Sequence, residues 1–306
     1  MRSLLLFLLA ASIAARGAEP EANVAAIVAF TEGPTADRAG NVYFTETTFN
    51  RIMKLAPDGK LTVFRENSNA ANGLVLDAQE RLIACEGGDK KGGRPRVTRT
   101  DLRTGQVEVL AAGFEGKPLN QPNDVTIDNS GRIYFTDFPG PNPVGVYRID
   151  TNGKVSRILV APQIQKPNGI MISPGDETLY LVESNGAEGG ARMIRAYDLQ
   201  PGGTVTNMRV FHNFSPGRSA DGLCIDVQGN LYAAAGLNRR RGTSETLDTK
   251  AGVHVFSAQG KLQRFIPIPE DTITNCAFGG KDRKTLYVTA GKTLFQIDNA
   301  ISGTTR

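Results

Sequence analysis

The sequence contains no Trp, only two His and only three Cys among its 306 residues. So few His and Cys argue strongly against a zinc site built from these two residue types. No apolar span of about 20 residues follows the N-terminus, which excludes a polytopic membrane protein. Hydrophobic residues make up 40% of the chain, which excludes a disordered one. Any chemistry must therefore depend mainly on carboxylates, amides, hydroxyls and basic side chains.

Glycine and proline are plentiful instead, with 34 Gly and 16 Pro. This composition requires many turns and is unfavourable for a helical protein. The length alone allows one large domain or two ordinary ones.

The N-terminus has the pattern of a secretory signal peptide. Arg2 supplies a positive n-region, residues 4–15 form an apolar core, and small residues around Gly17 suit a signal peptidase. The apolar stretch is too short to span a bilayer comfortably. We predict a signal peptide over 1–17, export to the periplasm or the medium, and no stable membrane insertion after cleavage.

Removal of this segment takes away Arg2 and Arg16, which leaves 33 basic against 31 acidic residues and a net charge near +2. So small a charge does not favour a nucleic-acid partner. Export permits disulfides, but three Cys cannot all pair within one chain. We expect buried thiols at Cys85, Cys224 and Cys276, with one disulfide as the alternative.

Six segments of the mature chain align as internal repeats. Their first residues are separated by 40, 51, 45, 53 and 54 positions. Each opens with a polar residue and a small or apolar run, continues through a turn, and ends in an apolar, aromatic-rich strand. The six opening residues, called the axial ring below, are Glu32, Asn72, Asn123, Asn168, Asp221 and Asn275.

Further strand–turn–strand pairs lie between the repeats. The runs 51–55 and 61–64 flank Asp58-Gly59, and 145–149 and 155–160 flank Asn152-Gly153. Such pairs are typical of hairpins. Four strands in a unit of this length form a propeller blade, so we predict an all-β, six-bladed propeller over 18–306 as one domain. A β-helix is the alternative, but its repeats are usually shorter.

The last repeat contains only three strands, the third at 293–297. A spare β-prone run occupies 23–30, before the first repeat. We predict that it completes the last blade as the outer strand, which removes an exposed edge.

In a propeller the opening residues lie near the axis at one end, and the second strand of each blade returns to that end. The returning positions, called the second ring, are Glu46, Glu86, Asp137, Glu183, Ala235 and Ala290. We expect both rings, with six carboxylates and four amides, to converge on the tunnel mouth. Like charges held so closely repel, and a bound cation relieves the repulsion.

Oxygen ligands of this kind suit a hard divalent ion, Ca²⁺ first, although Mg²⁺, Mn²⁺ or Zn²⁺ would also be accepted. The alternative is that these side chains cap strands and hydrogen-bond turns.

Several motifs resemble the SMP-30/gluconolactonase/luciferin-regenerating-enzyme family over nearly all of the mature chain. They are Glu32-Gly33-Pro34, Pro122-Asn123-Asp124, Tyr134-Phe135-Thr136-Asp137, Lys166-Pro167-Asn168-Gly169, Asp221-Gly222-Leu223 and Phe278-Gly279-Gly280. The resemblance implies a six-bladed propeller that holds a divalent metal in its tunnel. The ligand positions of the family match Glu32, Asn123, Asn168 and Asp221.

Two departures concern the site. The vertebrate branch has an Arg where Gln121 stands, so substrate contacts differ. Residues 134–138 look more like the bacterial lactonases, in some of which the aspartate matching Asp137 joins the metal shell. Asp137 is therefore either a ligand in place of Asn123 or an acid behind the ligands.

The resemblance implies hydrolysis of a sugar lactone such as glucono-1,5-lactone, by water attack on a metal-polarised carbonyl. We assign Asp221 as the base, with Asp137 as the alternative. The residues expected to hold substrate hydroxyls are Asn72, Glu86, Asn123 and Asn275.

The sequence leaves two other functions open. One is metal-dependent phosphotriester hydrolysis, and the other is a non-catalytic propeller that binds protein or glycan.

Four loops that follow second strands, at 87–97, 138–144, 184–191 and 236–252, are expected to surround the same face as the axial ring. Their basic residues include Lys90, Lys91, Arg94, Arg96, Arg239, Arg240 and Arg241. We interpret these as solvated loop charge in preference to a rim that attracts anions.

Overall fold

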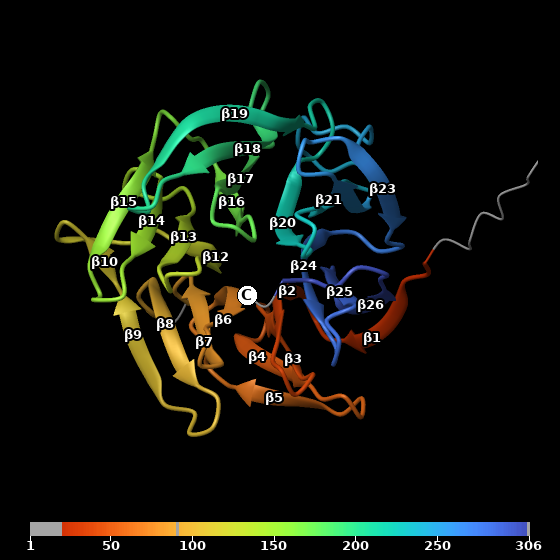
Figure 1. The fold of residues 1–306 in the computed structure, drawn as a ribbon, viewed down its shortest axis with the longest axis horizontal. Coiled ribbons are helices and arrows are strands. Elements are labelled where there is room, and N and C mark those ends of the chain that lie inside the picture. Colours follow the sequence, from red (N-terminus) through yellow and green to blue (C-terminus); the bar gives the residue numbers. More distant parts are fainter. Residues whose placement is uncertain (1–19, 90–91, 305–306) are drawn as a thin grey trace, which may run out of the picture.

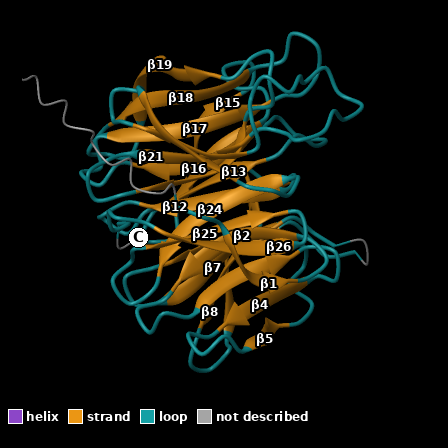
Figure 2. Ribbon diagram, turned by 90° about the vertical axis from the view of Figure 1, so that its right-hand side faces the viewer, coloured by secondary structure: helices purple, strands orange, loops and turns teal. Residues whose placement is uncertain are grey.

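The computed structural model describes residues 20–89 and 92–304 of the chain, and all the long regular elements in these ranges are β-strands (Figure 2). The expected signal peptide lies outside the described residues. Within the described ranges, no helix is long and apolar enough to cross a membrane.

Six four-stranded antiparallel sheets form the blades. Blade one contains β2 (Thr31–Ala36), β3 (Val42–Glu46), β4 (Arg51–Leu55) and β5 (Leu61–Arg65). Blade two contains β6 (Ala71–Leu76), β7 (Arg81–Glu86), β8 (Arg96–Asp101) and β9 (Val107–Ala111). Blade three contains β12 (Pro122–Ile127), β13 (Ile133–Asp137), β14 (Gly145–Ile149) and β15 (Val155–Val160).

Blade four contains β16 (Pro167–Ile172), β17 (Thr178–Ser184), β18 (Arg192–Leu199) and β19 (Val205–Asn213). Blade five contains β20 (Ala220–Ile225), β21 (Leu231–Ala235), β22 (Gly252–Phe256) and β23 (Leu262–Pro267). Blade six contains β24 (Ile273–Gly279), β25 (Thr285–Ala290), β26 (Thr293–Asp298) and β1 (Asn23–Ile27). A short hairpin, β10 (Gly113–Phe114) with β11 (Lys117–Pro118), follows blade two.

The blades surround a central axis, with the first strand of each repeat innermost (Figure 1). This arrangement confirms the all-β, six-bladed propeller predicted from the repeats. Because each blade is a meander, its second strand ends on the face where its inner strand begins. The described parts of the loops that follow these second strands, at 87–89 and 92–95, 138–144, 185–191 and 236–251, therefore stand on the face of the axial ring.

Blade six is closed by the N-terminal strand, as predicted. In the register of β1 against β26, Asn23 lies opposite Gln296 and Ile27 lies opposite Thr293. The Val28 N–H extends this contact by donating to the carbonyl oxygen of Lys292 at 2.7 Å. The pairing joins the two ends of the propeller and covers an edge strand.

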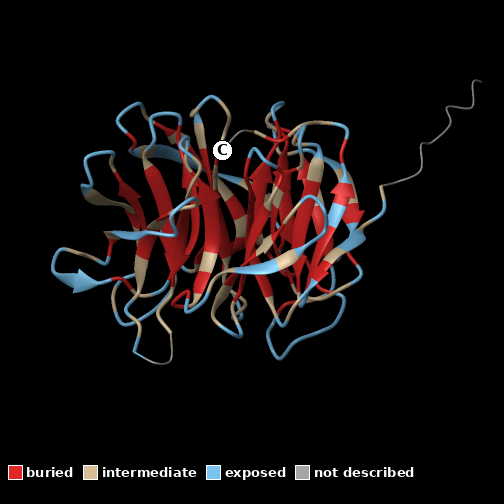
Figure 3. Cartoon of the chain, turned by 90° about the horizontal axis from the view of Figure 1, so that it is seen from below, coloured by how far each residue is buried: buried red, intermediate tan, exposed pale blue. Residues whose placement is uncertain are grey.

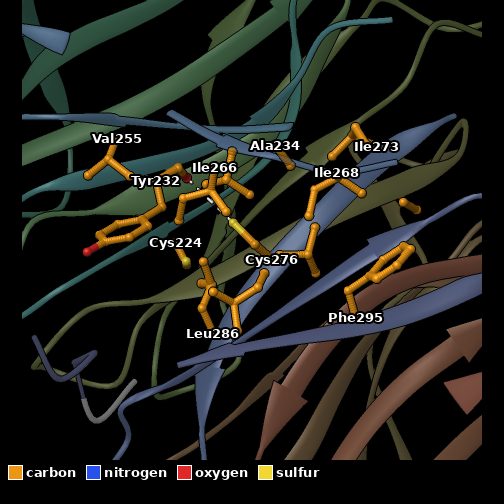
Figure 4. Close-up of a cluster of buried hydrophobic side chains, with 14 of the residues drawn as sticks. Cys224, Tyr232, Ala234, Val255, Ile266, Ile268, Ile273, Cys276, Leu286 and Phe295 are labelled. Carbon is orange, nitrogen blue, oxygen red and sulfur yellow. Dashed lines mark hydrogen bonds between the residues drawn. The ribbon is translucent and has the colours of Figure 1, made fainter. Parts of the chain in front are cut away.

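The apolar core lies between neighbouring blades and is buried over the middle of the strands (Figure 3). Cys224 and Cys276 pack in the cluster between blades five and six, where the Cys276 thiol contacts the Tyr232 carbonyl oxygen at 3.6 Å (Figure 4). Cys85 packs between blades two and three. All three are buried free thiols, and burial raises the pKa of Cys85 and Cys224 well above the usual value.

Residues 303 and 304 lie beside the last residues of β20, at the end of the tunnel opposite the axial ring. Gly303 bridges to Asp226, and the Thr304 N–H donates to the Ile225 carbonyl oxygen at 3.3 Å. A cavity of about 50 Å³ remains along the axis, with Thr304 among its lining residues. The tail thus covers one end of the tunnel.

Candidate metal and substrate site

The six inner strands share one irregularity. Each has a shift in its pairing register at or beside its axial-ring position. Such shifts re-aim side chains and are common next to functional sites. All six inner strands therefore begin at the tunnel mouth with the same kind of irregularity.

The ring positions differ in exposure. Glu32, Asn123, Asn168 and Asn275 are buried, whereas Asn72 and Asp221 are half-buried. Polar side chains so deep in a protein normally have hydrogen-bond partners. Within the described chain, the side chains of Asn72 and Asn123 form no such bond, so their amides are available to a ligand.

Three carboxylates share the mouth of the tunnel. Burial raises the pKa of Glu32 well above its usual value, and the negative charges of Asp221 and Asp124 raise it further. The Gly33 N–H, which donates to Glu32 Oε2 at 2.9 Å, acts in the opposite direction. The carboxylates therefore disfavour one another's ionised forms at the ring, and Arg218 offsets only part of this repulsion.

Among the described residues, Arg218 is the one buried cation that touches this group of carboxylates. Its Nη2 donates to Asp221 Oδ2 at 2.6 Å and its Nη1 donates to the Ile273 carbonyl oxygen at 2.9 Å. Burial raises the pKa of Asp221, while Arg218 and the amide of Asn168 lower it. Arg218 thus favours the ionised carboxylate and fixes its orientation by tying blade five to blade six.

Asp124 and Asn275 meet across the tunnel from opposite blades, three and six. Asn275 Nδ2 donates to Asp124 Oδ2 at 3.3 Å, and Asn275 Oδ1 accepts the Cys276 N–H at 2.8 Å. A Cβ added at Gly222 would lie 2.0 Å from Asn275 Cγ, so glycine is required there. This contact forms the floor of the site and commits both polar atoms of Asn275.

Burial raises the pKa of Asp124 to about 7. Sequence reasoning missed this acid because its register is occupied by Gly33, Gly73, Gly169 and Gly222 in four other repeats. An Asp at a position otherwise reserved for a small residue was the available signal. Arg218 was also missed, because its role depends on a loop conformation rather than on the repeat.

The second ring does not converge on the tunnel, which corrects the expectation. Glu46 lies opposite Thr31 in the ladder, one residue before Glu32, and blades two to five repeat this offset. Successive side chains of a strand point to opposite faces, so the offset turns the second ring away from the axial ring. Glu46 pairs with Arg51 at 3.0 Å, on its own blade.

Glu86 is fully buried and occupied, which does not fit its expected role on substrate hydroxyls. Arg65 Nη2 lies at 2.5 Å and Arg96 Nε at 2.6 Å from its carboxylate, and Thr98 Oγ1 donates to it at 2.7 Å. Arg96 and Thr98 belong to blade two, and Arg65 is the last residue of β5 in blade one. Glu86 therefore has the contacts of a structural anion.

Asp137 has a similar setting in blade three. Its two oxygens accept the N–H groups of Asn120 at 2.9 Å and Gln121 at 2.6 Å. Burial raises the pKa of Asp137 to about 6. The carboxylate holds the loop that leads into β12, whereas Asn123 at the strand start is left free, so the geometry favours Asn123 over Asp137 as a ligand.

The donors at the axial ring fit a hard divalent cation. The described residues contain no group of three or more His, Cys, Asp or Glu side chains arranged for a metal. The ring instead mixes the carboxylates of Glu32 and Asp221 with the amides of Asn123 and Asn168, and such oxygen sets suit Ca²⁺. Burial and the charges of Asp221 and Asp124 raise the pKa of Glu32, and a bound cation would relieve the repulsion between these carboxylates.

These features define the class of the protein as a six-bladed propeller with an acid–amide site at the tunnel mouth. A family model described as the SMP-30/Gluconolactonase/LRE-like region matches residues 30–292. The chain belongs to this family.

Two curated relatives cover most of the chain. The gluconolactonase of Zymomonas mobilis subsp. mobilis is 26% identical over 90% of this chain and 80% of its own length. The putative sugar lactone lactonase YvrE of Bacillus subtilis is 30% identical over 88% of this chain and 85% of its own length.

Among solved structures, a gluconolactonase of Xanthomonas campestris has a TM-score of 0.78 and 28% identity, with 94% of this chain and 92% of that chain covered. A calcium-binding regucalcin of Agrobacterium tumefaciens has a TM-score of 0.72 at 19% identity, covering 94% and 98%. The second likeness supports the fold alone.

Proposed function

We propose that the protein is a divalent-metal-dependent lactonase that opens a sugar lactone by carboxylate-assisted attack of water. The observation that carries the proposal is the group of Glu32, Asn168 and Asp221 at the tunnel mouth of a family whose relatives include gluconolactonases and lactonases. A propeller that only binds protein or glycan would not require carboxylates gathered at the tunnel mouth.

Glu32, Asn123, Asn168 and Asp221 would hold the cation, with Ca²⁺ as the first candidate. When bound, the ion supplies Lewis-acid polarisation of the lactone carbonyl and stabilises the charge that develops on its oxygen.

Asp221 is the proposed base. It is half-buried at the mouth, and Arg218 holds one of its oxygens at 2.6 Å in an orientation set by two hydrogen bonds. A carboxylate held in place in this way can, in its ionised form, accept the proton of an attacking water. Asp137 is the weaker candidate because backbone N–H groups occupy both of its oxygens.

Asn72 lies at the same mouth, on blade two, with its side-chain amide free among the described residues. Amides both donate to and accept from hydroxyl groups, so it is the proposed contact for substrate hydroxyls. Asn275 bonds to Asp124 and so supports the floor of the site instead of binding substrate.

The signal-peptide pattern of the N-terminal 17 residues supports the further proposal that the enzyme acts outside the cytoplasm.

Hydrolysis of glucono-1,5-lactone by Asp221→Asn, with Asp137→Asn as the matched control, tests the assignment. We expect kcat to fall by about 100-fold or more in Asp221→Asn, since general bases contribute roughly 10²–10⁴-fold. Asp137→Asn should keep most of the activity at a temperature where it is folded. Full activity in Asp221→Asn would exclude this residue as the base, and hydrolysis of a phosphotriester in preference to any lactone would replace the proposed reaction.

A further inference from the structure

A cavity of about 810 Å³ opens between blades two and three, on the face opposite the axial ring. Its rim is formed by the turns that join the first and second strands of these two blades and by the turn 150–153 between β14 and β15. Aliphatic side chains line its depth. They are buried on the inner and second strands and more accessible on β9, and they include Leu76, Ile83, Ile127, Ile133, Val109 and Leu110. The cavity therefore lies apart from the candidate metal site.

The repeats differ from one another at the position of this cavity. Five of the six second strands carry a tyrosine three residues before the second-ring position, and these residues are Tyr43, Tyr134, Tyr180, Tyr232 and Tyr287. Each of these rings packs in the cluster between its own blade and the next one. Blade two carries Ile83 at this position, and Ile83 belongs to the cluster between blades two and three.

The outer strand of blade two continues this difference. In blade one, Tyr43 packs edge-on against Phe64 of β5, with the ring centres 5.1 Å apart. The strand ladders place Leu110 of β9 at the position that Phe64 occupies in β5. Blade two therefore presents two aliphatic side chains where blade one presents two aromatic rings.

Asp77, on the rim, has the hydrogen bonds of its counterpart in blade three except for one. Asp128 Oδ2 accepts Arg132 Nε at 2.5 Å and the Tyr134 hydroxyl at 2.9 Å, and a tyrosine hydroxyl donates to the matching aspartate in blades one and five as well. Asp77 Oδ2 accepts Arg81 Nε at 2.7 Å. Within the described chain no hydroxyl donates to Asp77 Oδ2, so this oxygen can accept one more hydrogen bond.

The neighbouring blade also leaves the cavity uncovered. Between blades three and four, Arg132 and Arg148 each donate at 2.7 Å to a carbonyl oxygen of the turn 200–204. The matching side chains of blade two, Arg81 and Arg99, donate instead to side chains of their own blade. The strands β18 and β19, which flank the covering turn, have eight and nine residues, whereas β14 and β15 have only five and six. The shorter hairpin agrees with an open cavity at this interface.

We propose that the cavity is a second ligand site, which binds a small phenol with its ring against the aliphatic side chains around Ile83 and its hydroxyl donating to Asp77 Oδ2. The tyrosines of the other blades show that this fold accepts a ring and a hydroxyl in this arrangement. A phenol supplies both an apolar ring and a hydrogen-bond donor. The volume lies within the range of small-molecule sites, roughly 300–1,000 Å³, and leaves room for substituents on the ring. The site is independent of the proposed lactonase function.

Binding of 4-methylphenol, which is the tyrosine side chain as a free molecule, tests the proposal. Titration of ¹⁵N-labelled protein should show saturable shifts of amide signals at 76–83 and 127–133, with a Kd of about 1 mM or lower, as suits a ligand of so few atoms. Toluene has the same ring without the hydroxyl and should bind at least about 10-fold more weakly, because it makes no hydrogen bond to a charged group. Equal binding of the two probes, or no saturable binding of 4-methylphenol, would overturn the proposal.

Two variants locate the bound probe. Ile83→Tyr supplies the ring of the other repeats and should abolish binding of 4-methylphenol. Val109→Trp narrows the cavity from an exposed position and should weaken binding at least about 5-fold. Val63→Trp is the matched control, because Val63 is the exposed residue at the same position of blade one, and it should leave the Kd unchanged.

Binding that neither Ile83→Tyr nor Val109→Trp weakens would place the probe elsewhere and overturn the proposed site. Because Val109 is 49% exposed and Val63 is 38% exposed, both tryptophan variants should fold, so the test stands even if Ile83→Tyr does not. Lactone hydrolysis does not enter these measurements. Failure of the lactonase proposal therefore leaves the test of the phenol site intact.

Discussion

Replacement of Arg218 by Met tests how the charge at the tunnel mouth is organised. Met keeps the length of the side chain but removes the donors to Asp221 and Ile273. The side chains of Arg218 and Asp221 are only 9% and 15% exposed, so the change leaves a largely desolvated carboxylate beside Glu32 without its cation. Breaking a buried ion pair from one side costs about 3–5 kcal/mol, and the residual exposure places the expected loss near the lower end.

Arg195→Met is the matched control. Arg195 pairs with Glu183 at 3.1 Å, and their side chains are 13% and 0% exposed. This pair has similar burial but lies outside the axial ring. Both variants should therefore lose a comparable free energy of unfolding, about 3 kcal/mol in metal-free protein, and only one should disturb the site.

The assay combines urea unfolding in EDTA with kcat/KM for a lactone at a temperature where both variants are folded. We expect Arg218→Met to lose about 100-fold in kcat/KM relative to Arg195→Met, because misplacement of a catalytic group by about 1 Å has an effect of this size. A kcat/KM within threefold of the control would refute the positioning role. A loss of unfolding free energy well under about 1 kcal/mol would refute the burial argument.

Two further predictions concern stability. Burial raises the pKa of Asp137 to about 6, so the folded protein holds this proton more tightly than the unfolded chain, and the resulting stabilisation is complete below about pH 4 and lost as the pH rises through 6. Asp137→Asn should lack this decline, on the order of 3 kcal/mol, in unfolding measured from pH 4 to 7, and an unchanged pH profile would contradict the assignment. Gly222→Ala should cost about 1–3 kcal/mol, since its Cβ would meet Asn275 at 2.0 Å, whereas Gly202→Ala, with no atom within 4 Å of the added Cβ, should be neutral. Equal melting temperatures for the two variants would show that Asn275 can shift to accommodate the added Cβ at little cost, which contradicts the prediction.

The propeller and its closure were predictable because both depend on strand periodicity. The polar residue that opens each repeat shows which end of the inner strand lies at the tunnel mouth. The run 23–30 belongs to no repeat, and the last repeat lacks a fourth strand, so the predicted place of this run was beside β26. The axial ring follows from the same register. Local sequence is sufficient for these features because every blade repeats them.

The direction of side chains was harder to predict. Glu46 and Glu86 share the height of the axial ring, but an offset of one residue in the ladder turns them to the opposite face. The floor made by Asp124 and Asn275 joins residues 151 positions apart, across the axis. No repeat pattern encodes a contact between unlike residues of opposite blades, so these features required the three-dimensional structure.

Metal titration coupled to lactone hydrolysis tests the central claim most directly. Metal-free protein prepared with EDTA should bind one Ca²⁺ per chain, should be inactive, and should regain activity in proportion to the ion bound. The variant Asn168→Ala should weaken Ca²⁺ binding, and Arg195→Met should not. Activity that persists after complete removal of the metal, or protein that binds no divalent ion at the axial ring, would contradict the account.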